Sequence, residues 1–227
     1  MDGWRYMRSE ARYDGIADWY DSYARPSAES SRTELLSLLG HGQGLCLDLG
    51  CGTGLYFDAI RESGRSVVGI DQSADQLRIA GQRGGAIIQA DAHALPFTDA
   101  VFPTVIALWL STDVDDFAGV MRETRRILRP GGRLAVYGVH PCFNGPCVEV
   151  GDADTRVVHP TYRRAGWHES SPWWSTDGIR SRVGMRHLPL ADLLNALLDA
   201  GLQIMRVTEP RDEPVPFILA ILACRPA

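Results

Sequence analysis

The stretch LCLDLGCGTG, residues 45–54, joins a short apolar run to a glycine-rich bend. An apolar run that glycines stop in this way is typical of a strand buried on both faces of a sheet. A helix is expected from about Gly54. In open α/β sheets, ligands bind outside the carboxyl ends of the strands, where this bend would lie. The stretch therefore predicts a central strand that leads into a ligand-binding loop.

Outward from this stretch, predicted strands and helices alternate along the chain. Such alternation favours parallel strands joined by right-handed crossovers, with helices on both faces of the sheet. We therefore predict an α/β, Rossmann-like fold with a seven-stranded, mostly parallel sheet. The expected strands are 45–50, 66–71, 86–91, 104–110, 133–139, 203–208 and 217–224, and the expected helices are 13–24, 33–39, 73–82, 116–128 and 190–198.

The stretch 140–188, which follows the fifth predicted strand, breaks the alternation. It is rich in Gly, Pro, Trp, Tyr and His and shows no sustained period. A long irregular stretch in a compact domain usually serves function, so we expect a substrate lid inserted there. The whole chain, 1–227, is then one domain with leading helices at 1–42, a cofactor-binding core at 43–139, the lid at 140–188 and a closing helix and strands at 189–227.

Composition narrows the classes of partner. The net charge of −5 and the scattered basic residues argue against nucleic acid. No run of about 18 apolar residues occurs, so we expect no membrane span and no secretion signal. The five cysteines are odd in number and form no metal-binding or redox pattern, which favours free thiols in the cytoplasm and no metal site.

The glycine spacing indicates which ligand the loop holds. A dinucleotide fingerprint needs G-x-G-x-x-G, whereas Leu55 stands where its third glycine would fall. The Asp48 carboxylate, just before the glycines, would repel a pyrophosphate but suits a ligand with ammonium and sulfonium charges. The loop formed by Gly50, Gly52 and Gly54 is therefore expected to cradle a cationic ligand.

Acidic residues end the next two predicted strands. Asp71 stands at the distance at which such folds place an acid on ribose hydroxyls. Asp91, with Ala92, ends the third strand, where a carboxyl group could accept from the exocyclic amine of an adenine. Each acid could instead cap the helix that follows it. Three such signals at successive strand ends favour a nucleoside-containing cofactor.

These residues resemble class I S-adenosylmethionine-dependent methyltransferases, in particular the small-molecule group called type 11. The segments that carry the resemblance are LDLGCGTG, VVGIDQS, QADAHALPF and RILRPGGRLAVYG. The resemblance implies S-adenosyl-L-methionine as the cofactor. It places the methionine portion of the cofactor on Asp48 and on the glycine loop with Cys51. It places the ribose and the adenine edge on Asp71 and Gln72, and the adenine on Asp91 and Ala92. The backbone of Leu108 would bind the amino group of the cofactor.

The stretch YDGIADWYDSY also resembles the leading helix of this group, which implies that Tyr20 covers the cofactor; packing in the core is the alternative.

Many relatives carry paired histidines after the fourth strand, whereas this chain has Asp113 there, so Asp113 becomes a candidate for orienting the substrate. His140, directly after the fifth strand, is the first candidate for a general base, and a hydrogen-bonded loop histidine is the alternative. Aromatic residues of the lid are expected to wall the substrate pocket: Phe143, Tyr162, Trp167, Trp173 and Trp174.

The activity that the resemblance implies is methyl transfer to an O, N, S or C atom of a small molecule, with secondary metabolism as one setting. The sulfonium methyl is already activated, so positioning and exclusion of water matter most and a strong base is optional.

Among enzymes, a polyamine synthase or a nicotinamide-dependent oxidoreductase is the alternative, and the glycine spacing argues against the latter. A protein that keeps the site only to sense a ligand or to stabilise a partner subunit is the alternative from another class. The sequence does not indicate the oligomeric state.

Overall fold

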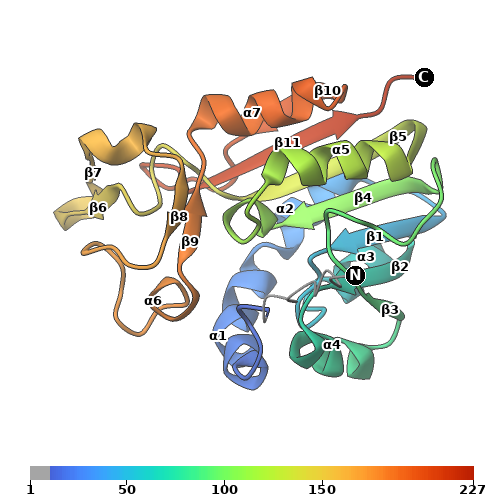
Figure 1. The fold of residues 1–227 in the computed structure, drawn as a ribbon, viewed down its shortest axis with the longest axis horizontal. Helices are drawn as coiled ribbons and strands as arrows, with labels where there is room; N and C mark the ends of the chain where they lie inside the picture. The colour runs from blue at the N-terminus through green and yellow to red at the C-terminus, as the bar shows by residue number, and fades with distance from the viewer. Residues whose placement is uncertain (1–10) are drawn as a thin grey trace, which may run out of the picture.

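Strand β1 (Leu45–Leu49) lies inside a seven-stranded sheet in the computed structural model, which describes residues 11–227. The other six strands are β2 (Ser66–Asp71), β3 (Ala86–Gln89), β4 (Phe102–Leu108), β5 (Leu128–Val139), β10 (Gln203–Thr208) and β11 (Ile218–Cys224). Their order is β10-β11-β5-β4-β1-β2-β3 (Figure 1). β11 is antiparallel to β5 and β10, and the remaining pairs are parallel. The predicted seven-stranded, mostly parallel sheet is confirmed.

Helices cover both faces of the sheet. Successive residues of a strand point to opposite sides, so apolar residues in succession need a covering layer on each face. Leu47 is buried in the core beneath one set of helices, and its neighbour Cys46 in the core beneath the other set. The first core packs against α5 (Phe117–Ile127) and α7 (Leu190–Asp199), and the second against α2 (Arg32–Leu39), α3 (Phe57–Glu62) and α4 (Ala74–Ala80).

The first helix, α1 (Ala17–Ser30), begins and ends later than the predicted 13–24. A contact distant in sequence sets its start: Asp75 Oδ2 accepts hydrogen bonds from the backbone N–H of Gly15 and of Ala17, at 2.9 and 3.3 Å. The helix continues through Pro26, which removes only one backbone donor. The segment before α1 therefore runs as a turn, which frees its side chains to reach the rest of the molecule.

The fourth and fifth strands also differ from their predicted bounds. β4 ends at Leu108 because Trp109 adopts a left-handed backbone conformation, with φ 61°. β5 begins at Leu128 rather than at residue 133, and it includes Pro130, Gly131 and Gly132. The pairing of β4 with β5 changes register in this region, and the extra residues are absorbed there.

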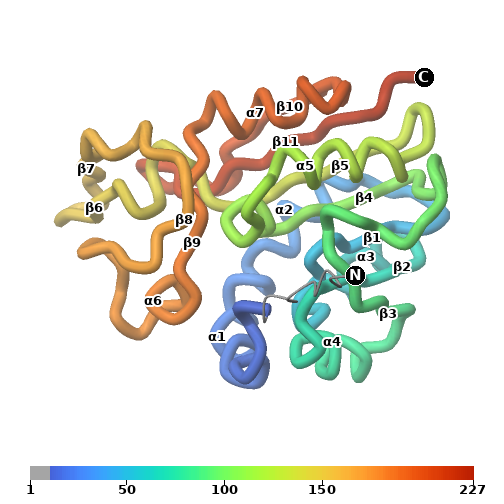
Figure 2. The backbone as a smooth tube through the Cα atoms, in the orientation of Figure 1, coloured from blue at the N-terminus to red at the C-terminus, as the bar shows by residue number. Residues whose placement is uncertain are grey.

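The segment 140–188, called the insertion below, contains more regular structure than the sequence indicated. Two antiparallel hairpins and a short helix form within it: β6 (Val148–Val150) with β7 (Arg156–Val158), β8 (Gly166–His168) with β9 (Met185–His187), and α6 (Arg180–Val183). Figure 2 shows the insertion, yellow to orange, as a separate group of loops beside the sheet. Its α6 contacts α1, where the Arg182 guanidinium lies 4.1 Å from the centre of the Trp19 ring.

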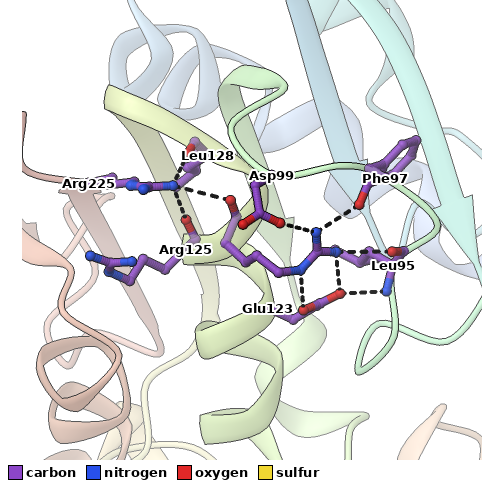
Figure 3. A network of polar contacts seen from close by, with 8 residues as sticks. Leu95, Phe97, Asp99, Glu123, Arg125, Leu128 and Arg225 are labelled. Carbon is purple, nitrogen blue, oxygen red and sulfur yellow. Dashed lines mark hydrogen bonds and ion pairs between the residues drawn. The ribbon is translucent and has the colours of Figure 1, made fainter.

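The loop after β3 is held by a single arginine of α5. Arg126 donates to the carbonyl oxygens of Leu95 and Phe97, and its guanidinium pairs with Glu123 and Asp99 (Figure 3). Glu123 in turn accepts from the Leu95 N–H at 2.8 Å. Several charge-assisted bonds therefore fix a loop that has little secondary structure of its own.

Candidate functional site

The glycine bend after β1 is held against β2. The N–H groups of Gly50 and Cys51 both donate to the Ile70 carbonyl oxygen, at 2.8 and 2.9 Å. Gly50 has φ +73°, and a Cβ atom there would lie 2.6 Å from Leu110 Cδ1. Only glycine satisfies both the backbone conformation and the space at this position.

A cavity of about 260 Å³ opens beside this bend. It lies at the carboxyl ends of β1, β2 and β4, where the fold class predicts a ligand. The structure brings most of the predicted site residues to its wall: Tyr20, Gly50, Gly52, Asp71, Gln72, Asp91, Ala92, Leu108 and Asp113. Asp48, Cys51, Gly54 and His140 are not among the residues that line it.

Asp71 joins the cavity to the glycine bend. Its Oδ2 accepts from the Gly52 N–H and its Oδ1 from the Ser73 N–H, both at 2.9 Å. Burial raises the pKa of this carboxyl group, and the backbone hydrogen bonds act in the opposite direction. The side chain is therefore fixed in place and retains acceptor capacity toward the cavity.

Asp91 lies on the loop that Arg126 holds, beyond the end of β3. Its Oδ1 accepts from the backbone N–H of His93 and contacts His93 Nδ1 at 2.7 Å. Partial burial raises the pKa of Asp91, but the bonds from His93 outweigh it and hold the pKa below its ordinary value. His93, which the sequence analysis did not single out, also lines the cavity, and its Nε2 contacts the Asp116 carbonyl oxygen at 3.0 Å.

Three predicted site residues of the LDLGCGTG stretch, Asp48, Cys51 and Gly54, do not line the cavity and have other surroundings. Asp48 is 1% exposed and its Oδ2 has no hydrogen-bond partner among residues 11–227. Burial, and secondarily the charge of Asp71, raises the pKa of Asp48 to about 8. Gly54, with φ +76°, packs against the Phe57 ring, and the thiol of Cys51 packs against Gly69. A direct contact of Gly54 or Cys51 with a ligand is thus not supported by their positions.

Two tyrosines from the start of the described chain enclose the cavity. Tyr20 of α1 lines it, and its ring lies 3.7 Å from the position of a Cβ atom on Gly52. Tyr13 also lines it and meets Tyr20 edge to face, with 5.2 Å between ring centres. The leading helix therefore covers the glycine bend, and contact of Tyr20 with the cofactor stays a prediction.

Asp113 forms a junction between three distant segments, called the Asp113 junction below. Its Oδ1 accepts from the Tyr13 hydroxyl at 2.9 Å and from Arg180 Nη1 of the insertion at 2.7 Å. Its Oδ2 accepts from the Thr112 hydroxyl at 3.1 Å. Burial lowers the pKa of Arg180, but the charge of Asp113 outweighs it and keeps that pKa above its ordinary value. Both oxygens of Asp113 are thus occupied, which favours a role in closing the site over one as a base.

Arg12 adds a second connection between the same segments. Its guanidinium pairs with Asp115 at 2.9 Å and lies 3.7 Å from the centre of the Trp167 ring in the insertion. Sequence reasoning missed Arg12, Tyr13 and Arg180, because nothing in their local patterns indicates that they meet beside the cavity.

Trp109 is a further residue that the sequence analysis missed. It lines the cavity, and its left-handed backbone is unusual for a bulky side chain. Two contacts hold it: Trp109 N donates to the Tyr137 carbonyl oxygen at 2.6 Å, and Nε1 donates to the Tyr56 hydroxyl at 2.8 Å. Backbone strain of this kind, of about 1–3 kcal/mol, persists where surrounding structure enforces it and is concentrated at functional sites.

The structure does not support the sequence-based role of His140 as a base facing the cavity. The side chain is buried, its Nε2 lies 3.0 Å from Glu209 Oε1, and its Nδ1 accepts from the Cys142 N–H at 3.2 Å. Because both ring nitrogens are engaged, the alternative of a hydrogen-bonded loop histidine fits better.

The aromatic residues of the insertion likewise do not wall the cavity. Trp173 stacks on His159, and Phe143 packs against the His140 ring. Tyr162 accepts from the Leu190 N–H at 2.8 Å. Trp167 contacts Arg12, which lines the cavity. These aromatic groups mainly hold the insertion together.

The cavity suits a neutral or cationic nucleoside better than a polyphosphate. Carboxylates at Asp71, Asp91 and Asp113 face it, backbone glycines allow close approach, and tyrosine rings cover it. No cluster of metal-ligating side chains occurs within residues 11–227. In the same part of the chain, no helix is long and apolar enough to cross a membrane.

Comparison with known proteins identifies the core. Residues 47–136 match the profile of a family described as "Methyltransferase domain". A demethylmenaquinone methyltransferase of Corynebacterium urealyticum is 38% identical over 90 residues, which are 40% of this chain and 39% of that protein. A demethylmenaquinone methyltransferase of Mycobacterium marinum is 33% identical over 130 residues, 55% of this chain and 56% of that protein. The chain thus spans about half or less of the length of these two relatives.

Among solved structures, an S-adenosylmethionine-dependent methyltransferase of Mesorhizobium loti resembles nearly the whole chain. The TM-score is 0.68 at 26% identity, and the match covers 93% of this chain and 99% of that one. The similarity therefore extends beyond the core to the leading helices and the closing strands.

Proposed function

Because residues 47–136 belong to the class I, S-adenosylmethionine-dependent methyltransferase family, we propose that the whole protein transfers a methyl group to a small molecule. The observation that carries the proposal is the cavity at the strand ends. It combines the backbone of Gly50 and Gly52 with the carboxylates of Asp71 and Asp91 on one wall. That set of groups matches an adenosyl ligand and offers no basic nest for a pyrophosphate.

Each side of the cavity has a separate role in holding the cofactor. Asp71, fixed by two backbone N–H groups, accepts from ribose hydroxyls. Asp91 and Ala92 lie where the adenine edge would bind, and Tyr20 covers the ligand opposite the glycine bend. When bound, S-adenosylmethionine would supply a methyl group activated by its sulfonium charge, and in-line attack of the acceptor on the methyl carbon would break the carbon–sulfur bond and release S-adenosylhomocysteine.

The acceptor side offers little help with proton removal. Asp113 has both carboxylate oxygens engaged, and His93, beside the adenine edge, has both ring nitrogens engaged. We therefore infer an acceptor atom that is already nucleophilic when it enters the site, such as a neutral amine, a thiolate or the carbanion of a C–H acid, the last two having lost their proton in solution. The names of the demethylmenaquinone relatives support a small-molecule acceptor.

Exclusion of water falls to the Asp113 junction and Arg12. Together they join the first described residues, the loop after β4 and the insertion beside the cavity. A site closed in this way protects the reacting groups from solvent and strengthens their electrostatic interactions. The junction must open for exchange of cofactor or acceptor.

The state of the cysteines supports a reducing compartment, and we propose the cytoplasm. All five, Cys46, Cys51, Cys142, Cys147 and Cys224, are free thiols.

Ligand binding tests the proposal directly. We expect S-adenosylhomocysteine to raise the melting temperature of the full chain and to bind with measurable heat, and NAD at the same concentration to do neither. A panel of thiol, amine and enolisable acceptors, supplied with S-adenosylmethionine, should then release S-adenosylhomocysteine with at least one member. Stabilisation by NAD alone would contradict the proposal, and binding without turnover on any acceptor would favour a ligand sensor.

A further inference from the structure

One residue of the cavity wall has hydrogen-bonding groups that the protein does not use. Gln76 lies in the first turn of α4, where its backbone N–H donates to the Ser73 hydroxyl at 3.1 Å. Its side chain is 1% exposed and lines the cavity. Neither the amide oxygen nor the amide nitrogen has a hydrogen-bond partner among residues 11–227.

The amide group lies against the glycine bend. Gln76 Oε1 is 3.4 Å from the position of a Cβ atom on Gly52, and the Gly52 N–H donates to Asp71 Oδ2. Gln76 and Asp71 therefore approach the same glycine and face the same cavity. Tyr20 borders this glycine as well, so the three side chains surround one part of the bound ligand.

A buried amide without a partner destabilises a protein, and a methionine or leucine would fill the same volume without that cost. Unpaired polar groups of this kind occur in native structures where a ligand or a water completes them. Gln76 also differs chemically from its neighbour: Asp71 can only accept, whereas an amide both donates and accepts. A ribose has two adjacent hydroxyls, each of which donates and accepts.

We propose that Gln76 is a second ribose-binding residue, whose amide bonds a ribose hydroxyl beside Asp71 and so selects a ligand with an intact ribose diol. This inference rests on the proposed function, because it assumes that the cavity binds the adenosyl group. It adds a specificity-determining residue that both donates and accepts, which Asp71 and Asp91 do not supply.

The test replaces the amide with an apolar side chain of similar shape, Gln76→Met, in the full chain. We expect S-adenosylhomocysteine to bind about tenfold more weakly by calorimetry, since one hydrogen bond to the ligand is lost. The ligand-free variant should melt at the same or a higher temperature, because the unpaired amide is gone. Gln203→Met, an exposed position in β10, is the matched control and should change neither property.

The ribose assignment needs a second arm with 2′-deoxy and 3′-deoxy analogues of S-adenosylhomocysteine. Wild-type protein should bind at least one analogue about tenfold more weakly than the parent, and Gln76→Met should lose little further affinity for that analogue. The inference would be overturned if Gln76→Met bound S-adenosylhomocysteine as tightly as wild type does. It would also be overturned if the substitution lowered the affinity for both deoxy analogues as much as it lowered the affinity for the parent, which would indicate packing or a bridging water. Wild-type protein that bound no S-adenosylhomocysteine at all would instead overturn the proposed function, and this inference with it.

Discussion

The wall of the cavity formed by the glycine bend and the strand ends differs in kind from the wall formed by the insertion. On the first, backbone geometry fixes the groups: Gly50 and Cys51 bond to β2, and Asp71 bonds to Gly52. On the second, a long side chain, Arg180, reaches Asp113 from a segment with only short elements. The first is set by the sheet and the second by contacts between side chains. We therefore expect the first wall to determine cofactor affinity and the second to determine access and acceptor choice.

The sharpest way to break this division is Gly50→Ala. Alanine disfavours φ +73°, and its Cβ would displace the Leu110 side chain, which also lines the cavity. We expect the affinity for S-adenosylhomocysteine to fall about 100-fold and the free energy of unfolding to fall by about 1 kcal/mol. Calorimetry and denaturant unfolding measure the two effects.

Gly131→Ala is the matched control for this variant. Gly131 has nearly the same backbone angle, φ +74°, and no atom within 4 Å of a Cβ placed there. It should therefore show a similar loss of stability with unchanged affinity. If Gly50→Ala bound the ligand as well as Gly131→Ala does, the bend would not be the cofactor cradle.

The same division explains what could be predicted from the sequence. The strand order and the placement of Asp71 and Asp91 followed from alternating elements, because parallel strands bring their carboxyl ends to one edge. Gly54 was predicted to line the ligand site and lies against Phe57 instead of on the cavity wall, a difference that glycine spacing alone does not reveal. Gln76 was missed because a glutamine in a helix is usually exposed, and its burial depends on Gly52 and Tyr20 from elsewhere in the chain.

The insertion resisted prediction for a different reason. Its aromatic residues suggested a substrate wall, but Trp173 and Phe143 pack on histidines of the same region instead. Such pairings depend on how short hairpins fold back, and composition does not encode that. Asp113 lines the cavity, but its partners Tyr13 and Arg180 could not be foreseen because they are 100 and 67 residues away in sequence.

A second way to test the division is Arg180→Met, which removes the cation from the Asp113 junction. We expect turnover, expressed as kcat/KM for an acceptor, to fall about tenfold, since the insertion would close less often over the cavity. The affinity for S-adenosylhomocysteine should change less than about threefold, because the strand-end wall is untouched. Hydrogen exchange of residues 160–187 should become faster in the variant.

Arg182→Met is the control, since Arg182 lies in the same short helix but contacts Trp19 instead. Asp113→Asn in the Arg180→Met background should recover part of the lost stability, because the half-buried carboxylate that has lost its cation is then neutralised. A cofactor affinity that fell as far as turnover would show that the junction holds the cofactor itself and that the two walls are not separable.

The smallest effect on activity is expected for His140→Ala, which separates the two interpretations of this histidine. The ring is 3% exposed, it bridges Glu209 and the Cys142 N–H, and it does not line the cavity. We therefore expect turnover within about twofold of wild type and a loss of about 1–3 kcal/mol in the free energy of unfolding, since a buried pair of hydrogen bonds is removed. His41→Ala, at an exposed histidine, should change neither quantity.

A general base would instead contribute about 10²–10⁴-fold to the rate. If His140→Ala slowed turnover that much while cofactor affinity stayed constant, the first residues of the insertion would have to rearrange during the reaction. The acceptor would then bind between β5 and the insertion rather than at the Asp113 side of the cavity.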